Sequence, residues 1–266
     1  CSSDLAYSVP CMFSFLNRDN YSPGEADKQS NVLDILKQAK INTLWIDNNS
    51  SCKGVCDRIK LRDIYIEDND ETGERSAFDE KLIKLMAPYI EGSDQDTLIV
   101  LHIMGSHGPA YHRRFPKGSA KFKPYCQSSA PQECTDEEVA NAYDNTLLYT
   151  DYFLSKLIGY LKQNEEKYES FMFYASDHGE SLGENGIYLH GLPYFLAPKA
   201  QTHVPMMVWF SDAYRAQRDN LNIKADEDYS HDNLSATLMG LYGVKSSIYD
   251  KKLDLFSGVN ALKPGN

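Results

Sequence analysis

The 266-residue sequence has no apolar run of about 18 residues, the length that a membrane-spanning helix needs. It also lacks a signal peptide and starts abruptly at Cys1. We therefore interpret it as a mature or excised piece of a longer protein. Basic residues are in the minority, 27 against 38 acidic ones, which gives a net charge of -11. Because binding to a phosphate backbone needs clustered lysine and arginine, this balance argues against a nucleic-acid partner.

Internal repeats and low-complexity linkers are absent as well. Hydrophobic residues make up 42% of the sequence and charged residues 24%, which is typical of a globular protein and not of a disordered or fibrous one. A chain of this length can bury a sizeable core without help from metals or disulfides. We therefore expect a single domain over residues 1–266.

The cysteines are few, but they fall in three close pairs. These are Cys1 with Cys11, Cys52 with Cys56, and Cys126 with Cys134. Six cysteines allow fifteen connectivities, and the sequence alone does not choose among them. Local pairing is the simplest interpretation, and each disulfide would stabilise the fold by roughly 2–3 kcal/mol. Buried thiols and a zinc site are the alternatives, although a zinc site more often has a second pair or histidines nearby. Disulfides would imply an oxidising compartment such as a periplasm.

Helical and strand-like patterns alternate along the chain. Residues 31–40 have apolar side chains at helical spacing, and Thr135 with Glu138 has the spacing of a capping box. Residues 97–104 and 171–176 are near-continuous apolar runs, as expected of strands buried on both faces. The expected helices cover 31–40, 78–90, 135–163 and about 231–241, and the expected strands cover 41–46, 97–104, 171–176 and 204–210. This order predicts an α/β fold with a mostly parallel sheet flanked by helices.

Polar residues follow the ends of three of these strands. Asn49 follows the first, His107 the second, and Asp177 with His178 the third. Open α/β sheets bind ligands beyond the carboxyl ends of their strands, so we expect these side chains to share one rim.

The pair Asp177 and His178 indicates a metal site at this rim. A carboxylate beside an imidazole suits zinc or manganese. His190 lies twelve residues after His178 in a glycine-rich stretch and can reach back to the same place. A single histidine is more often a surface or structural residue. An Asp-His pair joined by His107 and His190 favours the metal site.

Lys53 follows Asn49 by four residues, just past the end of the same strand. A lysine and an asparagine there can hold a phosphate group, through a point charge and a hydrogen-bond donor. The alternative is an ordinary solvated lysine, and the spacing alone favours that alternative.

Five stretches of the sequence are similar to motifs of one bacterial family, and they occur in the family's order. They are AYSVPCMFSFL (6–16), LWIDNNSSCKGVCD (44–57), HIMGSHGPAYHRRF (102–115), NAYDNTLLYTD (141–151) and SDHGESLGENGIYLHGLP (176–193). The chain thus resembles the lipid A phosphoethanolamine transferases, which include the mobile colistin-resistance enzymes, over nearly its whole length. The resemblance implies an alkaline phosphatase/sulfatase-like fold, three local disulfides, and a catalytic domain truncated at its N-terminus. It also implies a location at the periplasmic face of the bacterial inner membrane, with a membrane anchor preceding Cys1.

The resemblance also implies roles for individual residues. The zinc ligands of the family fall on Asp177 and His178. Contacts to the substrate or to a second metal fall on His107 and His190, and contacts to the phosphoethanolamine group fall on Asn49 and Lys53.

The nucleophile position departs from the family's pattern. The family has a threonine four residues after the first cysteine of its motif, and here that position is Leu5. Leucine has no oxygen with which to attack phosphorus. Ser3 is the nearest substitute that we consider, although a shift at a helix start moves a side chain by several ångströms. A further zinc ligand of the family, a glutamate, lies upstream of this chain.

The resemblance implies a zinc-dependent transfer of phosphoethanolamine from phosphatidylethanolamine to lipid A or a similar envelope acceptor. The reaction would pass through a phospho-enzyme intermediate and would link the protein to polymyxin resistance. The alternatives are a metal-dependent hydrolase of phosphate or sulfate esters, and a non-catalytic binding domain that has lost the nucleophile.

Overall fold

Helices and strands alternate along the chain in the computed structural model, which describes residues 1, 5–64, 78–218, 221–223 and 227–257. The α-helices are α1 (Leu5–Phe13), α2 (Pro23–Ala26), α3 (Val32–Gln38), α5 (Lys81–Glu91), α6 (Asp136–Gln163), α7 (Lys199–Thr202), α8 (Asp212–Ala216) and α9 (Asp232–Leu241). The strands are β1 (Asn42–Asp47), β2 (Lys60–Asp63), β3 (Thr97–His102), β4 (Phe171–Ala175), β5 (Ser181–Leu182), β6 (Tyr188–Leu189) and β7 (Met206–Phe210). Short 3-10 turns are η1 (Tyr111–Arg113), η2 (Lys117–Ser119), η3 (Pro131–Glu133) and η4 (Glu184–Gly186).

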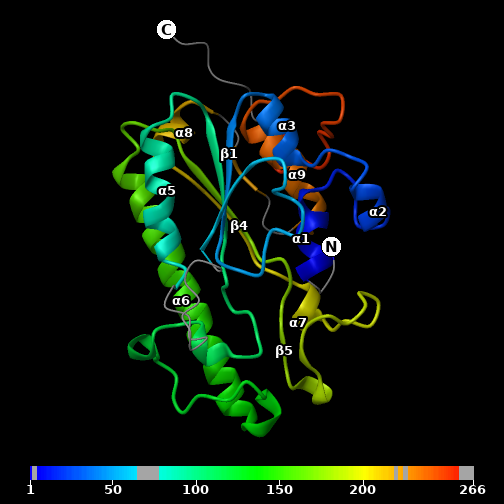
Figure 1. Ribbon diagram of the computed structural model, residues 1–266, viewed down its shortest axis with the longest axis vertical. Helices are drawn as coiled ribbons and strands as arrows, with labels where there is room; N and C mark the ends of the chain where they lie inside the picture. The colour runs from blue at the N-terminus through cyan, green and yellow to red at the C-terminus, as the bar shows by residue number, and fades with distance from the viewer. Residues whose placement is uncertain (2–4, 65–77, 219–220, 224–226, 258–266) are drawn as a thin grey trace.

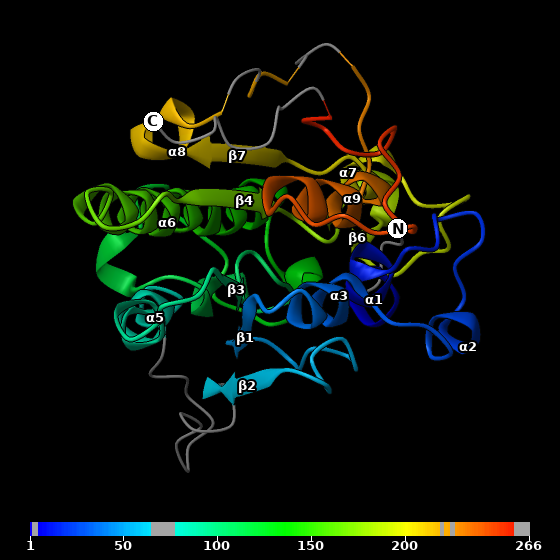
Figure 2. The ribbon, with the colours of Figure 1, turned by 90° about the horizontal axis from the view of Figure 1, so that it is seen from above.

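The elements form three layers, with strands between two layers of helices (Figure 1, Figure 2). Helices α1, α3 and α9 cover one face, and α5 and α6 cover the other (Figure 2). Each predicted helix and strand is present, with ends shifted by no more than three residues. Within the described ranges, no helix is both long and apolar enough to cross a membrane.

The strands form a parallel sheet and an antiparallel pair. The parallel sheet has the order β2-β1-β3, and the separate pair is β4 with β7. The α/β class with a parallel sheet is confirmed. The strand at 204–210 differs from the expected parallel, buried arrangement, because β7 runs antiparallel to β4 and Met207 is 42% exposed. An antiparallel strand at the edge of an otherwise parallel sheet is common in α/β proteins.

Two helices begin with reciprocal side-chain caps. Thr135 accepts a hydrogen bond from the backbone N–H of Glu138, and the Glu138 carboxylate accepts one in return from the N–H of Thr135, as the spacing predicted. Asn31 and Asp34 make the same exchange at the start of α3. These caps satisfy backbone groups that have no partner within the helix, so they fix where each helix starts.

Two apolar cores lie on opposite faces of the strands. Trp45 and Val100 pack on the face that α1, α3 and α9 cover. Their sequence neighbours Ile46 and Leu101 pack against α5 and α6 on the other face. Because successive side chains of a strand point to opposite faces, both faces must be apolar, which explains the near-continuous apolar runs.

A cavity of about 1430 Å³ lies between β3 and β4, and its lining includes every residue of both strands. All six residues of β3 are only half-buried, as are four of the five residues of β4. The prediction that residues 97–104 are fully buried is therefore wrong for this chain. The physical reason is the cavity, which borders β3 on the edge away from β1.

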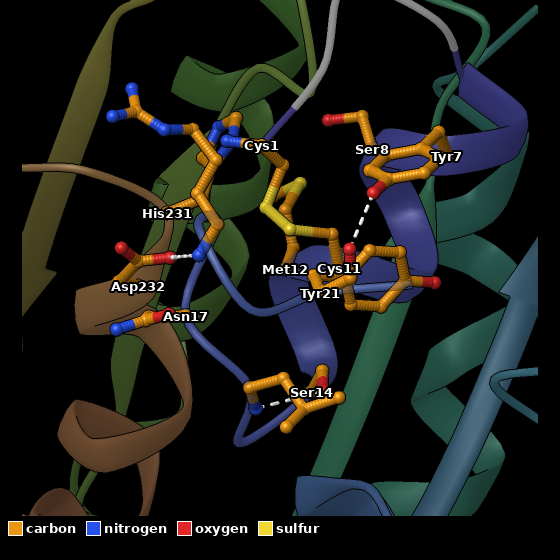
Figure 3. The surroundings of a disulfide bond; sticks show 12 residues. Cys1, Tyr7, Ser8, Cys11, Met12, Ser14, Asn17, Tyr21, His231 and Asp232 are labelled. Carbon is orange, nitrogen blue, oxygen red and sulfur yellow. Dashed lines mark hydrogen bonds between the residues drawn. A yellow bond between two sulfur atoms is a disulfide. The ribbon is translucent and has the colours of Figure 1, made fainter. Parts of the chain in front are cut away.

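Three disulfides link cysteines that are close in sequence. They are Cys1–Cys11, Cys52–Cys56 and Cys126–Cys134, the three local pairs. The first of them ties Cys1 to helix α1 (Figure 3). Beside it, the Tyr7 hydroxyl donates a hydrogen bond of 2.6 Å to the carbonyl oxygen of Tyr21. Helix α1 is thus held covalently in its last turn, at Cys11, and by a hydrogen bond in its first turn, at Tyr7.

The backbone at Gly179, just after β4, passes very close to α7. A Cβ atom at this position would lie 2.0 Å from the carbonyl oxygen of Ala200. We expect Gly179→Ala to lower the free energy of unfolding by about 1–3 kcal/mol, since backbone must move to relieve the clash. The matched control is Gly159→Ala within α6, where nothing lies within 4 Å. That change should stabilise the helix by about 0.5–1 kcal/mol. Urea unfolding measures the free energy of unfolding of both variants. A Gly179→Ala variant as stable as the Gly159→Ala variant would contradict the close approach at Gly179.

His231, which precedes α9, is buried and donates from Nε2 to the carbonyl oxygen of Ser176, 2.8 Å away. Burial is the largest cause that lowers the pKa of His231 to about 4. Between pH 6.5 and 4 the unfolded chain therefore binds a proton that the folded chain does not. Stability should fall by about 3 kcal/mol across this window as the pH drops. His231→Gln should remove that part of the pH dependence in denaturant titrations. A variant with the same acid slope as the wild type would show that this imidazole does not cause it.

Candidate functional site

Three side chains after β4 form the centre of the candidate site. One ligand atom from each of His178, Glu180 and His190 lies within 4.8 Å of the other two. His178 and Glu180 come directly from the loop after β4. The antiparallel ribbon of β5 and β6 then reverses the chain and returns His190 to Glu180, with His190 Nδ1 3.1 Å from Glu180 Oε1.

His107 joins this group from the end of β3. Its ring centre lies 5.2 Å from that of His190 and 6.2 Å from that of His178. The His178 and His190 rings are 3.9 Å apart. The structure thus brings together three histidines that the sequence separates by as many as 83 positions (190 minus 107).

Two carboxylate oxygens in this cluster are buried without a hydrogen-bond partner. They are Asp177 Oδ2 and Glu180 Oε2. Asp177 Oδ2 lies 3.6 Å from Nε2 of His178. The other oxygen of Glu180 accepts a hydrogen bond of 2.9 Å from the backbone N–H of Gly108. A buried, unpaired carboxylate oxygen is costly, and a bound cation would remove that cost. Imidazole nitrogens with carboxylate oxygens are a zinc donor set, so these residues fit that metal.

Glu180 was not among the site residues that the sequence predicted. The available signal was the run Asp177-His178-Gly179-Glu180 itself, since Gly179 lets the two residues on either side of it approach the same point.

Backbone carbonyls orient two of the rings. His107 Nδ1 is 2.6 Å from the oxygen of Gly108, and His178 Nδ1 is 3.0 Å from that of Gly179. A carbonyl only accepts, so Nδ1 carries the proton and Nε2 keeps its lone pair. This is the usual outer-shell arrangement for a metal-binding histidine. Burial is the main cause that lowers the pKa of His107, which keeps its ring neutral at pH 7.

Helix α1 reaches the site through Ser8. This buried residue donates a hydrogen bond of 2.6 Å from Oγ to the carbonyl oxygen of Asp177. Leu5 is the first residue of α1, so the nucleophile position of the family lies one turn before Ser8. Ser3, the substitute considered from the sequence, lies outside the described residues.

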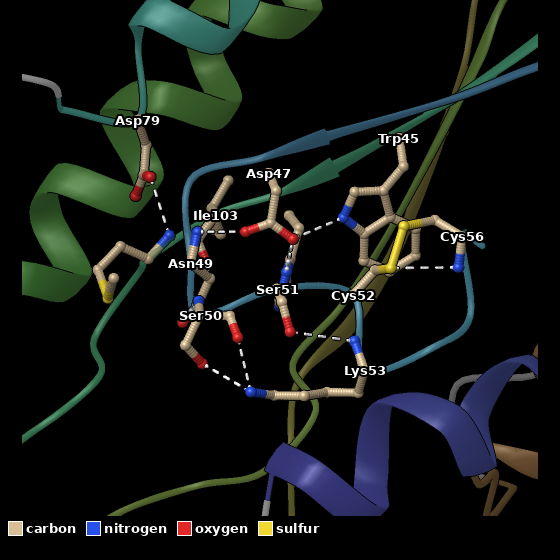
Figure 4. A network of polar contacts seen from close by, with 12 residues as sticks. Trp45, Asp47, Asn49, Ser50, Ser51, Cys52, Lys53, Cys56, Asp79 and Ile103 are labelled. Atoms are coloured by element: carbon tan, nitrogen blue, oxygen red, sulfur yellow. Dashed lines mark hydrogen bonds and ion pairs between the residues drawn. A yellow bond between two sulfur atoms is a disulfide. The ribbon is translucent and has the colours of Figure 1, made fainter. Parts of the chain in front are cut away.

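Asn49 lies at the rim, and its amide is used internally. Its Nδ2 donates to the carbonyl oxygen of Ile103, and its Oδ1 accepts from the N–H of Ser50 (Figure 4). Asn49 lines the same cavity as His107 and Asp177. Its contacts fasten the end of β1 to the end of β3.

Lys53 points back toward its own loop. Its Nζ donates 2.6 Å to the carbonyl oxygen of Ser50 and lies 3.2 Å from the hydroxyl of the same residue (Figure 4). Lys53 is not among the residues that line the cavity beside the histidines.

A buried carboxylate supports this part of the rim. Asp47 accepts hydrogen bonds from Trp45 Nε1 and from the N–H of Asn49, at 2.8 and 2.7 Å (Figure 4). It accepts a third, of 2.9 Å, from His102 Nδ1. Burial alone would raise the pKa of Asp47, but the bonds from these groups, His102 first, outweigh it and hold the pKa below its usual value. His102 therefore has a structural role, since its ring helps to hold the Asp47 carboxylate in place.

Comparisons with known proteins agree with this geometry. A sequence model of the sulfatase family matches residues 6–244. Phosphoethanolamine transferase EptA of Escherichia coli K12 is 44% identical over 96% of the chain and 48% of its own length. Phosphatidylethanolamine transferase Mcr-1 of Escherichia coli is 40% identical over 92% of the chain and 46% of its own length. The chain thus spans about half the length of these curated relatives.

A solved structure shows the same fold. The soluble domain of lipooligosaccharide phosphoethanolamine transferase A from Neisseria meningitidis superposes with a TM-score of 0.91 at 38% identity. The match covers 99% of this chain and 80% of that one. Since the family model covers most of the chain and these identities extend over nearly all of it, the chain belongs to the sulfatase family, within its group of phosphoethanolamine transferases.

Proposed function

We propose that the protein containing this chain transfers phosphoethanolamine from phosphatidylethanolamine to lipid A or a similar envelope acceptor. The proposal depends on one observation, the cluster of His178, Glu180 and His190 with the unpaired oxygens of Asp177 and Glu180. The names of the relatives support the group that is transferred. A metal-dependent hydrolase of phosphate or sulfate esters would use the same cluster, and the sulfatase-family match keeps it as the alternative.

We propose zinc as the metal at this cluster. Asp177 and His178 would hold it, as the family resemblance implies, and Glu180 offers a further buried oxygen. When bound, zinc supplies a Lewis acid that stabilises negative charge on phosphoryl oxygens. His107 and His190 then contact the substrate or a second metal.

Three further residues of the chain have separate roles in this proposal. The lone pair on Nε2 of neutral His107 can accept a hydrogen bond from the ammonium of ethanolamine. Lys53 must leave Ser50 in order to place its charge on the phosphate. Asn49 uses one N–H of its amide on Ile103 and one lone pair on Ser50, so its second N–H can still donate to the phosphoethanolamine group.

Leu5 affects the covalent step. The family's transfer needs a hydroxyl that attacks phosphorus and holds the phosphoryl group, and Leu5 supplies none. This observation favours a second candidate function for the chain as given, a domain that binds phosphoethanolamine lipids without transferring the group.

The proposed location is the periplasmic face of the bacterial inner membrane. The three disulfides support an oxidising compartment. We propose that a membrane anchor outside residues 1–266 holds the domain there. The truncated domain of residues 1–266 would be the catalytic one. Polymyxin resistance would be the consequence of its modification of lipid A.

Zinc binding provides the first test. We expect His178→Ala and Glu180→Gln to weaken zinc binding by more than about 100-fold, since loss of an outer-shell group alone costs 10–100-fold. His112→Ala, in the turn η1, is the matched control and should leave the affinity unchanged. Isothermal titration with zinc measures all three. Equal affinities for the wild type and His178→Ala would refute this metal site.

The covalent step provides the second test. With phosphatidylethanolamine and zinc, Leu5→Thr in the longer parent protein should form a phospho-enzyme that intact-mass spectrometry detects, whereas residues 1–266 with Leu5 should form none. The threonine variant should also release diacylglycerol faster when lipid A is present. Release that does not depend on lipid A would favour the hydrolase. A wild-type adduct on Ser3 or Ser8 would show that position 5 is not the nucleophile position.

A further inference from the structure

The segment between β3 and α6 is positively charged in an otherwise acidic chain. Residues 97–132 contain no aspartate or glutamate, although the whole chain has 38 of them and a net charge of -11. The same residues include a cluster of lysines and arginines: Arg113, Arg114, Lys117, Lys121 and Lys123. Such an asymmetry produces a positive potential over one part of the surface, which attracts anions that the rest of the chain repels.

Four of these side chains are exposed and form what we call the basic surface: Arg113, Lys117, Lys121 and Lys123. Among the residues that the structure describes, no ion pair involves any of the four. Arg218, by contrast, pairs with Glu169 at 2.9 Å. The charges of the basic surface therefore contribute no ion pair to the fold, and they stay available to an external anion.

Helix α6 holds part of the basic surface in a fixed shape. The backbone N–H groups of Lys121 and Phe122 both donate to Oδ1 of Asn145, at 2.7 and 3.0 Å. Nδ2 of this buried asparagine donates in return to the carbonyl oxygen of Phe122, at 2.9 Å. One turn earlier on α6, Asn141 donates to the carbonyl oxygen of Pro124. The segment thus lies along the lower half of α6 in Figure 1, and its fixed backbone lowers the entropy cost of binding a ligand.

Arg114 connects the basic surface to the candidate site. Its Nε donates a hydrogen bond of 2.6 Å to the carbonyl oxygen of His107. Burial and, after it, the positive charges of Arg113, Arg114 and Lys117 lower the pKa of His112, so these cations lie near one another. The positive potential therefore begins beside the histidine cluster and continues outward along the segment.

Phosphate groups on a lipid suit this surface. Lysine and arginine bind phosphate through their charge and their several N–H donors. Phe122 lies between two of the lysines in sequence and is 41% exposed, so the surface combines cations with an apolar ring, as membrane-binding surfaces do. In the proposed reaction one phosphate of the acceptor approaches His107 and His190. A cationic surface that starts at His107 then contacts the rest of the same head group.

We propose that the basic surface binds a second phosphate of the acceptor while the first phosphate lies at the histidine cluster. The preferred acceptor is thus a glycolipid whose head group carries two phosphates, as lipid A does, over one that carries a single phosphate. Two phosphates on one head group engage the fixed cations and the cluster for a single loss of translational freedom. This inference rests on the proposed function, since it requires the reacting phosphate to lie at the cluster.

Vesicle co-sedimentation tests the proposal without a catalytic step. The probes are phosphatidylcholine vesicles that contain lipid A with two phosphates, or twice as much lipid A with one phosphate. Lys117→Gln, Lys121→Gln and Lys123→Gln, combined, should weaken binding to the first vesicles by about 100-fold, since each lysine near an anionic lipid surface is worth about fivefold. This loss should occur with and without zinc, because these lysines belong to no candidate ligand set. No loss in the absence of zinc would overturn the basic surface.

Zinc should add a preference for two phosphates. With zinc, the wild-type chain should bind the bisphosphorylated lipid at least about tenfold more tightly than the monophosphorylated one, and the triple variant should lose this preference. Equal binding of both lipids by a zinc-loaded chain would overturn the two-phosphate assignment and leave the proposed function standing. If the zinc titration described above shows no metal site, the proposed function fails instead.

The matched control removes the same charge elsewhere. Lys162→Gln, Lys251→Gln and Lys252→Gln, combined, change exposed lysines at the far end of α6 and after α9, and should weaken binding less than about fivefold. Equal losses in the two triple variants would show that only net charge matters, which would overturn the proposal. Arginine at positions 117, 121 and 123 keeps the charge and should keep the affinity. A loss in that variant with unchanged urea unfolding would also contradict the charge-based surface.

Discussion

The close approach of two backbone segments at Gly179 is the constraint on which the candidate site depends. The N–H of Gly179 donates to the carbonyl oxygen of Gln201 at 2.9 Å, and there is no room for a side chain between the two segments. His178 and Glu180 flank this contact, so their side chains leave the chain at a point that α7 holds in place. A looser contact would separate the ligand atoms that now lie within 4.8 Å of one another.

In the same region, backbone hydrogen bonds hold the side chains of the candidate site in place. The carbonyls of Gly108 and Gly179 each fix a histidine ring, and the N–H of Gly108 fixes Glu180. Peptide groups from two strand ends therefore hold His107, His178 and Glu180, and the Glu180 carboxylate in turn holds His190. The geometry of this cluster depends on the distance between β3 and β4, which belong to separate sheets with a cavity between them.

The candidate metal site and the nucleophile position of the family lie on different elements of this chain. The histidines and carboxylates form one cluster on strand ends, whereas the nucleophile position lies on helix α1. Ser8 joins the two parts through the carbonyl oxygen of Asp177. A leucine at position 5 therefore removes a hydroxyl from α1 and leaves the cluster of His178, Glu180 and His190 in place.

The sequence by itself determined four of the helices, four of the strands and the main metal candidates. Apolar periodicity and the Thr135–Glu138 cap located helices and strands to within three residues, because these signals depend on neighbours in the chain. It also predicted that Asp177, His178, His107 and His190 share one rim, because parallel strands end at the same edge.

Only the tertiary structure decided the rest. The role of Glu180 depends on the β5–β6 ribbon, and the contacts of Lys53 depend on the path of its own loop. The half-exposed state of β3 could not be predicted either, since an apolar run has the same pattern whether or not a neighbouring strand is present. Pairing between strands depends on groups distant in sequence, and no local pattern in these 266 residues specifies which edge stays open.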